Sequence, residues 1–595
     1  MTSKVFSYKA SSSKSISNRA LILASLSRGT SKLNNVPYGD DVDLMIHNLR
    51  LLDVHIKETR GRNARTLIIT GMNNKIDQRA ALPLKTIKLH TGNAGTTTRF
   101  ILAFSTLLNK KITLNGSDRM QQRPIKDLVD ALRSLGANIT YNTKVGHLPV
   151  TVHPQVPMGG SIAIDASKTS QFVSSLLLIV PFLERKTTLR IQGLGPSQSY
   201  IESTRALVHE WGKKGKNKIY SIPSDIASAS YIIAIAILSC TKIVFENYTR
   251  SPLHPERKFL ETLEKIGCKL KVQRDTLEIT PPMSRKSLGT IDASTMPDTA
   301  LTLAMIAVLT PGKTTLKNIQ HLKYKECDRL RALHKELTKL GIRVKKTSDS
   351  LTIWGHTKPL PKKSIQTYSD HRIALAFSIL KSQYPQIAIK NPEVVQKSYP
   401  NYWRNYREFT LSLNKNIVLI GMPGAGKTSF GKALAKYWKY DFVDLDELFE
   451  SRTHTTITSY TETHGWEAFR KKETELLKNL KPTRRTILAT GGGVILKKEN
   501  ISLLKNLGTI VYLKTTYENL LSHLNKETKT VTQRPHLSDR QSIERALKRL
   551  YRERTPLYDS ASQITIMPIN ETRNSKKDLT RKIQSLEQEL FYTAP

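Results

Sequence analysis

The hydrophobic and polar positions of the first 410 residues repeat one short arrangement. A stretch with apolar residues three and four positions apart is followed by one turn residue and then by alternating apolar and polar positions. This pattern predicts an amphipathic helix, a turn and a half-buried strand. It occurs at 44–59, 128–142, 259–273 and 330–347, with turns at Asp53, Gly136, Gly267 and Gly341.

A degraded fifth copy, TRALVHEWGKKGKNKIY, is predicted to turn at Gly212. Successive turns then lie 83, 76, 55 and 74 positions apart. Such spacing predicts a repeated α/β unit, and the short interval indicates that the copy after Gly212 lacks about 20 residues. Because a unit that loses two strands leaves unpaired strand edges, we expect residues 205–225 to be among the least protected of this region.

The last third of the chain opens with a different pattern. The run NKNIVLIG (414–421) predicts a buried strand, and SFGKALAKYW predicts a helix. Between them the sequence fills G-x-x-x-x-G-K-[ST], a loop whose N–H groups face phosphate oxygens while its Lys and Thr serve the phosphates and Mg²⁺. The expected ATP-binding residues are Gly424, Ala425, Gly426, Lys427, Thr428 and Ser429, after Gly421.

Further motifs of this segment suggest an acceptor site. We expect YDFVDLDELFE to be a strand that brings Asp444 and Asp446 to one face, where one acid serves Mg²⁺ and the other an acceptor hydroxyl. GWEAFRKKE places Phe469, Arg470 and Glu473 on one helical face. ILATGGGVI predicts a strand that ends in three glycines, and two later motifs add Arg534 and Arg554.

Composition narrows the class of protein. The 595 residues are 39% hydrophobic and include three cysteines without metal-ligand spacing, which favours a reducing cytoplasm. The longest apolar runs, 172–183 and 231–240, are shorter than the roughly 20 residues of a membrane span. A net charge of +44, spread along the chain, leaves a basic nucleic-acid-binding ATPase as an alternative.

The N-terminal residues allow a second reading. Residues 1–39 contain no acid and many serines, as a targeting segment does. Cleavage there would remove SKSISNRA (13–20), which is predicted to open a helix with Lys14, Ser15 and Arg19 at its anion-attracting end. We therefore expect no targeting segment.

Polar clusters separate the repeated units. They contain many cations and few acids, as a site for a multiply anionic substrate requires. The clusters are SKSISNRA, TGNAGTTTR, QQRPIKDL, KTSQFVSS, MPDTA, KYKECDRLR, YSDHRIA and VVQKSYPNY.

With these motifs in this order, residues 1–410 resemble 5-enolpyruvylshikimate-3-phosphate synthases. The resemblance implies two globes built from βαβαββ repeats, one repeat being truncated here, with globe crossovers near residues 13 and 226 and a site in the cleft. It also implies transfer of enolpyruvyl from phosphoenolpyruvate to shikimate 3-phosphate without a metal. The motif KECDRL disfavours the related UDP-sugar enolpyruvyl transferases.

The resemblance assigns roles by motif position. Asp298 would handle the hydroxyl proton, Glu326 the methylene proton, and Lys14 would lie between the substrates. The residues implied for phosphoenolpyruvate are Lys14, Asn93, Gly95, Arg123, Gln171, Arg329, Arg372 and Lys397. Those implied for shikimate 3-phosphate are Lys14, Ser15, Arg19, Thr169, Ser170, Gln171, Ser197, Asp298 and Lys325.

The second segment, assigned to 414–595, resembles shikimate kinases over 414–569. The resemblance implies a parallel sheet and ATP-dependent phosphorylation of shikimate. Thr428 and Asp444 would hold Mg²⁺, and Lys427, Asp446 and Arg534 would be catalytic, with Arg534 in a lid that also contacts ATP. Phe469 would pack on the shikimate ring and Glu473 would orient its neighbours. The residues implied for shikimate are Asp446, Arg470, Gly492, Gly493 and Arg554.

Together the two resemblances imply one polypeptide for consecutive steps of aromatic amino-acid biosynthesis, in the domain order of fungal multifunctional shikimate-pathway polypeptides. Its partners would be the small molecules shikimate, shikimate 3-phosphate, phosphoenolpyruvate and ATP, with neither a membrane nor nucleic acid. A kinase with an impaired synthase domain is the alternative among enzymes, because of the truncated repeat.

Overall fold

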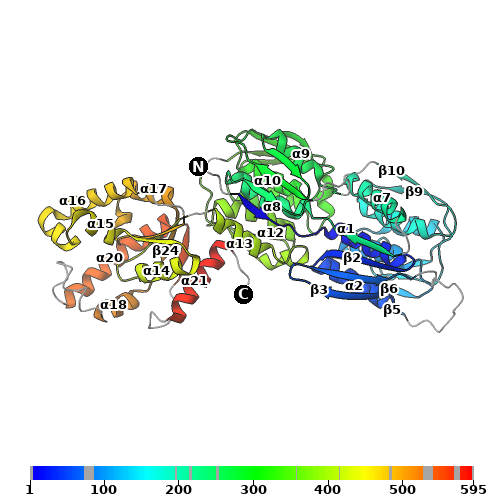
Figure 1. Cartoon of the computed structure of the whole chain (residues 1–595), viewed down its shortest axis with the longest axis horizontal. Coiled ribbons are helices and arrows are strands. Elements are labelled where there is room, and N and C mark those ends of the chain that lie inside the picture. Colours follow the sequence, from blue (N-terminus) through cyan, green and yellow to red (C-terminus); the bar gives the residue numbers. More distant parts are fainter. Residues whose placement is uncertain are drawn as a thin grey trace. The chain divides into compact units, whose positions relative to one another are not determined.

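A computed structural model gives the fold of two compact units (Figure 1). Unit 1 comprises Met1–Gln383 and Ile389–Tyr402, and unit 2 comprises Tyr384–Ala388 and Trp403–Pro595. The structure describes residues 5–72, 86–193, 197–213, 217–248, 254–356, 358–413, 416–480, 485–526, 540–567 and 576–591. Among these residues, no helix has the length and apolar character needed to cross a membrane.

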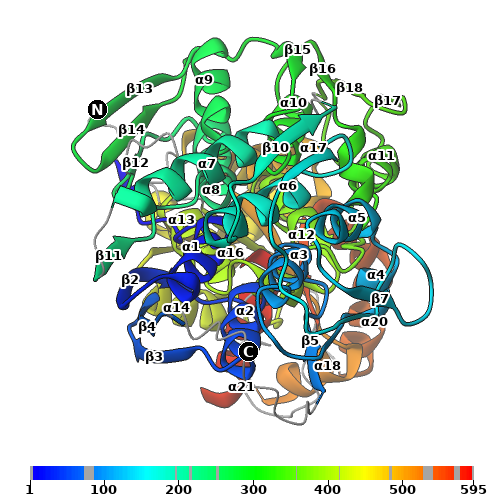
Figure 2. The ribbon, with the colours of Figure 1, turned by 90° about the vertical axis from the view of Figure 1, so that its right-hand side faces the viewer.

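Three sheets form the first globe of unit 1, residues 14–221 (Figure 2). Their orders are β11-β2-β4-β3, β5-β6-β8-β7 and β10-β9. The strands are β2 (Thr30–Pro37), β3 (His55–Arg60), β4 (Ala64–Thr70), β5 (Ile87–His90), β6 (Ile112–Asn115), β7 (Ile139–Tyr141), β8 (Val150–Val152), β9 (Ser161–Asp165), β10 (Thr188–Gln192) and β11 (Lys218–Ser221). The helices are α1 (Lys14–Leu26), α2 (Asp40–Leu51), α3 (Gly95–Ser105), α4 (Asp118–Gln121), α5 (Lys126–Ser134), α6 (Ser170–Ile179), η1 (Val180–Phe182) and α7 (Gln198–Lys213).

The second globe repeats this organisation over residues 226–397 and takes one strand from the N-terminal segment. Its sheet orders are β1-β12-β14-β13, β15-β16-β18-β17 and β19-β20. The strands are β1 (Phe6–Tyr8), β12 (Ile243–Phe245), β13 (Lys269–Gln273), β14 (Thr276–Thr280), β15 (Gly289–Asp292), β16 (Lys313–Lys317), β17 (Val344–Lys346), β18 (Leu351–Trp354), β19 (Ser364–Ile365) and β20 (Ala388–Ile389). The helices are α8 (Ile226–Leu238), α9 (Arg257–Lys265), α10 (Ala300–Val308), η2 (Gln320–Tyr324), α11 (Arg329–Lys339), α12 (His371–Gln383) and η3 (Pro392–Lys397).

Two adjacent segments carry the chain between the globes. Residues 9–13 lead from β1 to α1, and residues 222–225 lead from β11 to α8. Backbone hydrogen bonds join them, from Ser13 N to Pro223 O at 2.8 Å and from Asp225 N to Ser11 O at 2.8 Å. The two segments that connect the globes are therefore hydrogen-bonded to each other.

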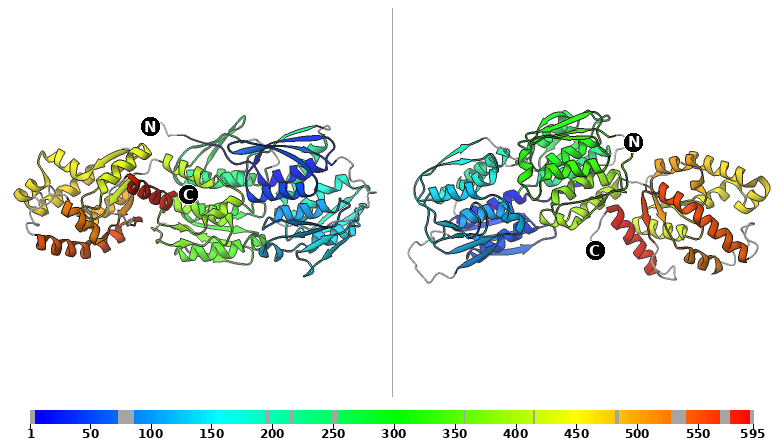
Figure 3. Two further views of the ribbon diagram at one scale, coloured as in Figure 1. Left: turned by 90° about the horizontal axis from the view of Figure 1, so that it is seen from below. Right: turned by 180° about the vertical axis from the view of Figure 1, so that it is seen from behind.

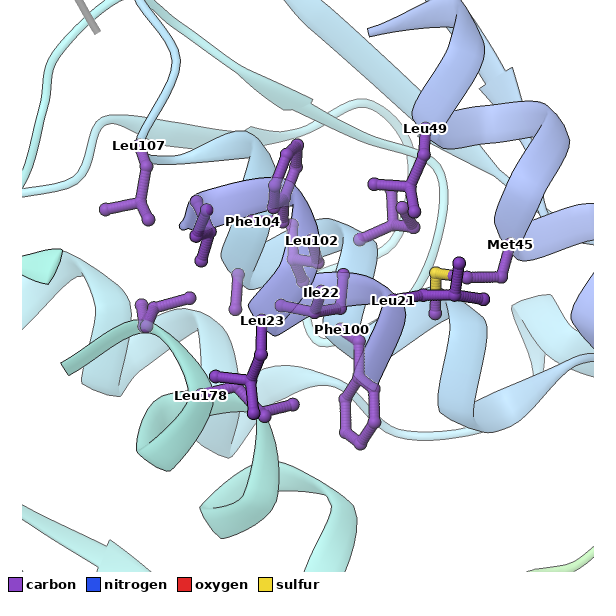
Figure 4. Packing of buried hydrophobic residues seen from close by; sticks show 14 of the residues in the cluster. Leu21, Ile22, Leu23, Met45, Leu49, Phe100, Leu102, Phe104, Leu107 and Leu178 are labelled. Atoms are coloured by element: carbon purple, nitrogen blue, oxygen red, sulfur yellow. The ribbon is translucent and has the colours of Figure 1, made fainter. Parts of the chain in front are cut away.

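Buried helices form the core of the first globe. In α1, every residue from Ile16 to Leu26 is buried, including the polar Ser17, Asn18, Arg19 and Ser25, so neighbouring elements enclose this helix on all sides. Figure 4 shows Leu21 and Leu23 of α1 with Phe100 of α3 and Leu178 of α6. Because α1 and α3 are fixed by this core, their N-terminal residues are held in place.

The predicted helix–turn–strand repeat is confirmed in four copies. Helices α2, α5, α9 and α11 are followed by strands β3, β7, β13 and β17. The turn residues Asp53, Gly136, Gly267 and Gly341 have φ values of 65°, 104°, 97° and 77°. This left-handed conformation ends a helix and favours glycine.

The predicted turn at Gly212 is wrong. Gly212 lies inside α7, which continues to Lys213. Leu207 and Trp211 are buried, and Trp211 Nε1 donates to Ser27 Oγ at 2.8 Å, so packing against α1 holds the helix together at this glycine. The following strand, β11, pairs in parallel with β2 and is therefore an edge strand of the β11-β2-β4-β3 sheet.

The predicted loss of a strand pair after Gly212 is confirmed, because α7 ends at Lys213 and the next described strand, β11, belongs to another sheet. Strands β9 and β10 pair in parallel, as β5 and β6 do. The hairpin β7–β8 completes the β5–β6 sheet, whereas the described residues between β10 and β11 hold only α7. The truncated repeat is therefore a two-stranded sheet.

Unit 2 is built on a parallel five-stranded sheet in the order β22-β23-β21-β24-β25. Figure 3 shows its helices around these strands. The strands are β21 (Ile417–Ile420), β22 (Asp441–Asp444), β23 (Thr486–Ala489), β24 (Thr509–Leu513) and β25 (Ile564–Ile566). The helices are α13 (Tyr402–Ser412), α14 (Lys427–Trp438), α15 (Leu445–Thr453), α16 (Ile457–Asn479), η4 (Val494–Leu496), α17 (Lys498–Leu507), α18 (Tyr517–Lys526), α20 (Arg540–Ala561) and α21 (Lys576–Phe591).

Candidate active sites

The first helix presents its N-terminus to the polar residues of unit 1. Ser13 caps α1 by accepting from Ile16 N. Lys14 Nζ lies 2.7 Å from Asp41 Oδ2 at the start of α2. Burial alone would lower the pKa of Lys14, but the charges of Asp41 and Glu326 outweigh burial and raise it. Lys14 is therefore a charged ammonium group.

Arg19 lies one turn further along α1 and is fully enclosed. Its guanidinium donates to Ser15 Oγ at 2.6 Å, Thr204 Oγ1 at 2.7 Å and Ser174 Oγ at 3.1 Å. Burial lowers the pKa of Arg19 to about 10. Since these partners are neutral hydroxyl groups, Arg19 has positive charge to offer an anion.

A close contact between Gly95 and Arg123 shapes the start of α3. A Cβ atom at Gly95 would lie 2.4 Å from Arg123 Nη2, so a side chain there would displace the guanidinium. Asn93 O accepts from Arg123 Nη1 at 3.5 Å. Gln171 of α6 reaches the same turn through Thr96 Oγ1 at 3.2 Å.

Several buried polar atoms beside this turn have no hydrogen-bond partner among the described residues: Asn93 Oδ1, Arg123 Nε and Gln171 Oε1. Unsatisfied buried groups are costly unless a ligand or water completes them. Their gathering around Gly95 is the arrangement that a polar ligand would complete.

Arg329 is the centre of a buried ion network in the second globe. Its Nε lies 2.8 Å from Asp370 Oδ2, its Nη2 lies 2.8 Å from Glu326 Oε2, and its Nη1 lies 3.4 Å from Asp298 Oδ1. Asp298 Oδ2 also pairs with Arg372 Nη2 at 2.8 Å. The network brings together four of the predicted site residues.

Two side chains, Lys397 and Arg119, join this network to the first globe. Lys397 Nζ lies 2.9 Å from Glu326 Oε1 and 2.9 Å from Asn93 O. Arg119 Nε donates to Glu326 O at 3.0 Å, and its Nη2 donates to Lys325 O at 3.2 Å. Residues from both globes therefore build one site.

The cations of the site hold its carboxylates in their charged form. Burial would raise the pKa of Asp298, but Arg372, Lys325 and Arg329 lower it well below its ordinary value. Burial would also raise the pKa of Glu326, but the charges of Lys397 and Arg329 outweigh burial and lower this pKa well below its ordinary value. Burial lowers the pKa of Lys325 to about 8.

Three predicted residues make their contacts beside the ion network. Thr169 caps α6 by accepting from Gln171 N at 3.2 Å, and Ser170 is the first residue of that helix. Ser197 has a φ of 76°, and its N donates to Ser294 O of the second globe at 2.6 Å.

Sequence reasoning did not select Asp41, Arg119, Tyr200, Glu256 or Asp370. Asp370 was within reach, because it precedes the selected Arg372 in the motif YSDHRIA. Asp41 is one of two adjacent acids at the start of α2, and only the fold shows which one meets Lys14. Glu256 had no motif to mark it.

The glycine-rich turn of unit 2 follows the fully buried strand β21, as predicted. Gly424 and Gly426 have φ values of 81° and 79°, a conformation that turns the loop into α14. Ala425, between them, and Ser429, in the first turn of α14, belong to the same turn. Lys427 Nζ donates to Gly421 O and Met422 O, each at 3.0 Å, which places its ammonium group against the loop.

Thr428 and the first acid of the D-x-D motif meet at the end of the sheet. Thr428 Oγ1 donates to Asp444 Oδ2 at 2.7 Å. The expectation that one strand carries both acids is wrong, because β22 ends at Asp444 and Asp446 lies in the first turn of α15. Asp444 caps that helix, accepting from Asp446 N at 3.0 Å, and this local bond ends the strand.

Three glycines after β23 allow charged side chains to approach the backbone. A Cβ atom at Gly493 would lie 1.9 Å from Arg470 Nη2, and one at Gly491 would lie 2.7 Å from Asp446 Oδ1. A Cβ atom at Gly492 would lie 2.6 Å from Pro423 Cδ, next to the glycine-rich turn. The predicted acceptor residues Asp446 and Arg470 therefore lie beside the three glycines, and these lie beside the glycine-rich turn that precedes α14.

The predicted face of α16 is confirmed. Arg470 Nη1 lies 2.9 Å from Glu473 Oε2, and its guanidinium lies 4.9 Å from the centre of the Phe469 ring. Burial raises the pKa of Glu473. Glu473 and Phe469 therefore orient Arg470 toward the glycines.

Helix α20 also contacts Gly492, one of the three glycines that follow β23. Arg554 Nη1 donates to Gly492 O at 3.2 Å, and the Tyr558 hydroxyl donates to the same oxygen. Tyr558 is a contact that sequence reasoning missed, although it stands four residues after Arg554 on the same helix face. The predicted Arg534 lies outside the described residues.

Comparison with known families gives two matches on separate ranges. Residues 4–406 match the family of EPSP synthase (3-phosphoshikimate 1-carboxyvinyltransferase). Residues 423–587 match the family of shikimate kinase.

Individual proteins agree with this division. The chain is 33% identical over 598 residues to the pentafunctional AROM polypeptide of Schizosaccharomyces pombe and 31% identical over 593 residues to that of Yarrowia lipolytica. These alignments cover 90% and 91% of this chain, which spans 37% of the length of each relative. An EPSP synthase structure from Acinetobacter baumannii has the same fold, with a TM-score of 0.56 and 21% identity over 68% of this chain and 96% of that one. The chain therefore belongs to the EPSP synthase family and carries a shikimate kinase domain after its synthase domain.

Proposed function

We propose that this chain catalyses two consecutive reactions of aromatic amino-acid biosynthesis. ATP phosphorylates shikimate in unit 2, and phosphoenolpyruvate transfers its enolpyruvyl group to the resulting shikimate 3-phosphate in unit 1. The observation that carries the proposal is the pairing of two family matches with two assembled sites, one in each matched range. The proposed domains are residues 1–410 and 414–595.

Charged side chains of unit 1 suit the transfer reaction. Asp298 takes the proton of the 5-hydroxyl, whose oxygen attacks the enol carbon, while Glu326 delivers a proton to the methylene carbon. The tetrahedral adduct then loses a proton from the new methyl group and expels inorganic phosphate. The ionised state of Asp298 supports its role as base. Glu326 is also ionised in the ligand-free site, so it must gain its proton when the substrates bind.

The substrates find matching cations. Arg123, Arg329, Arg372 and Lys397 hold phosphoenolpyruvate, with Asn93, Gly95 and Gln171 shaping its pocket. Ser15, Arg19, Thr169, Ser170, Ser197 and Lys325 hold shikimate 3-phosphate, and Lys14 lies between the two substrates. The neutral surroundings of Arg19 support a phosphate site there.

The kinase reaction uses the glycine-rich turn and the acceptor residues beside it. Residues 424–429 hold the nucleotide phosphates, and Lys427 neutralises their charge. Asp446 orients the shikimate hydroxyl, and Arg470, Gly492, Gly493 and Arg554 hold shikimate through its carboxylate. We assign Arg534 to the transferring phosphoryl group.

A magnesium site fits the residues at the end of β22. The hydroxyl of Thr428 and the carboxylate of Asp444 lie 2.7 Å apart, and oxygen donors are the ligands that Mg²⁺ prefers. Bound with ATP, the ion neutralises charge on the phosphates. The proposal places both steps in the cytoplasm, where the three free cysteines would stay reduced.

A coupled assay tests the proposal. The chain is incubated with shikimate, ATP, Mg²⁺ and phosphoenolpyruvate, and both phosphorylated products are followed by mass spectrometry. We expect the enolpyruvyl product only when all substrates are present. Accumulation of shikimate 3-phosphate alone would leave a kinase with an impaired synthase, and ATP hydrolysis that depends on nucleic acid and ignores shikimate would indicate a basic ATPase.

A further inference from the structure

Tyr200 of α7 places its hydroxyl between two buried carboxyl groups. Its oxygen lies 2.9 Å from Asp298 Oδ2 and 3.0 Å from Glu256 Oε1. Burial raises the pKa of Tyr200, as do the charges of Asp298 and Glu256, so the phenol is neutral. A neutral phenol carries one proton and can donate to only one of the two oxygens. The other pair is a hydrogen bond only if a carboxyl group carries a proton.

Asp298 is the carboxyl group that faces the cations. Arg372 Nη2 lies 2.8 Å from its Oδ2, and Arg329 Nη1 lies 3.4 Å from its Oδ1. A proton on Asp298 would weaken both ion pairs inside a buried site, where an unpaired charge is costly. Asp298 is therefore the charged member of the pair.

Glu256 has a different environment. It is buried immediately before α9, and no Lys or Arg of the described chain forms an ion pair with it. Its Oε2 accepts from Thr299 N at 3.1 Å and Thr299 Oγ1 at 2.7 Å, while its Oε1 accepts from Asp298 N at 3.2 Å. Among the described residues, the charges with the largest effect on it are those of Asp298 and of Arg372 on α12. Burial raises the pKa of Glu256, and Asp298 raises it further.

We propose that Glu256 is protonated in the resting enzyme and is a positioning residue for Asp298. The carboxylic acid of Glu256 donates to the Tyr200 oxygen, and the Tyr200 hydroxyl donates to Asp298 Oδ2. This chain fixes the orientation of the Asp298 carboxylate without adding a second negative charge beside it. The inference rests on the role proposed above for Asp298 as the base of enolpyruvyl transfer.

Replacement by the neutral isostere separates this arrangement from a merely structural one. In Glu256→Gln the amide can still donate to Tyr200 and accept from Thr299, and only the Asp298 N–H, 3.2 Å from Oε1, loses its acceptor, so we expect no more than a few-fold loss of transfer. Glu256→Ala removes the hydrogen-bond donor of Tyr200 and leaves the Asp298 and Thr299 amides without their acceptor, so we expect a loss of about tenfold or more. An ionised Glu256 would compete for the Tyr200 proton, so the alkaline limb of kcat/KM should move to higher pH in Glu256→Gln.

The protonation state can be read without turnover. Burial and the charge of Asp298 raise the pKa of Glu256 to about 7. Below this pH, infrared spectra of the ligand-free full chain should contain the carbonyl stretch of a protonated, buried carboxylic acid, and Glu256→Gln should remove it. The matched control is Glu336, a buried glutamate that accepts from the Tyr368 hydroxyl at 2.6 Å but also pairs with Lys339 at 2.8 Å. Glu336→Gln should leave the band in place. Tyr200→Phe should keep the band and shift its frequency, because the acid loses its acceptor.

These measurements can overturn the inference separately from the proposed function. No band that depends on Glu256, or a loss in Glu256→Gln as large as in Glu256→Ala, would mean that Glu256 is ionised. Absence of transfer in the wild-type chain would refute the proposed reaction, whereas the infrared result would still decide the state of Glu256.

Discussion

Glu326 is a single buried residue whose two carboxylate oxygens bond to different cations, Arg329 at 2.8 Å and Lys397 at 2.9 Å. If it delivers the methylene proton, Glu326→Ala should lower kcat for enolpyruvyl transfer by roughly 10²–10⁴, the usual effect of a positioned acid or base. Binding of shikimate 3-phosphate should change much less, because its proposed phosphate site at Arg19 lies apart. Steady-state rates and ligand titration measure the two effects.

The control for this variant is an exposed acid of the same globe. Glu264 lies on the solvent side of α9, so Glu264→Ala should leave both quantities unchanged. A turnover of Glu326→Ala within a few-fold of wild type would show that another group supplies the proton.

Lys325 gives the site a pH dependence. Burial lowers its pKa to about 8, although Asp298 acts in the opposite direction. Because a lysine is charged below its pKa, the affinity of the ligand-free enzyme for shikimate 3-phosphate should fall as the pH rises above about 8. Titration of Kd against pH measures this fall. In Lys325→Arg the charge persists, so the fall should flatten, and an unchanged profile would assign the dependence to another group.

The helices and strands that could be predicted from the sequence are those whose starts and ends depend on neighbouring residues. The starts of α1, α3 and α14 followed from small or capping residues before apolar runs. The turn predicted at Gly212 is wrong because the contact of Trp211 with Ser27, which is distant in sequence, keeps this segment helical. The strand predicted to include Asp446 is wrong because Asp444 caps a helix that begins at the next residue. Pairings such as Arg329 with Asp370 have no local signal at all.

The two-stranded sheet is the weak element of the first globe. Strand β10 has no buried residue, and its second edge lacks the hairpin that completes the β5–β6 sheet. Since α7 is anchored by buried Leu207 and Trp211, the lowest protection should lie at 161–165 and 188–192 rather than at 205–225. Hydrogen exchange should show amides of β9 and β10 exchanging about tenfold faster than those of β5 and β6.

Strands β5 and β6 are a matched reference, because they have the same parallel pairing within a four-stranded sheet. Equal protection of the two strand pairs would mean that packing under β9 replaces the missing hairpin. Fastest exchange at 205–213 would restore the expectation drawn from the sequence.

The whole molecule combines two sites that share no residue. Unit 1 assembles its ion network from residues between Lys14 and Lys397, and unit 2 assembles its glycine-rich turn from residues after 416. The sequence predicted this division, since the strand, glycine-rich turn and helix of unit 2 form a complete motif.

Lys427 tests the independence of the sites. Its ammonium group lies 3.0 Å from Gly421 O and 3.0 Å from Met422 O, both in unit 2. Lys427→Ala should abolish phosphorylation of shikimate, because the nucleotide phosphates lose their neutralising charge. Transfer of enolpyruvyl to supplied shikimate 3-phosphate should remain nearly intact. On the same helix, Lys432 is exposed and pairs with Glu447 at 3.1 Å, so Lys432→Ala should preserve both activities. Equal loss of both activities in folded Lys427→Ala would mean that the two reactions depend on one shared site.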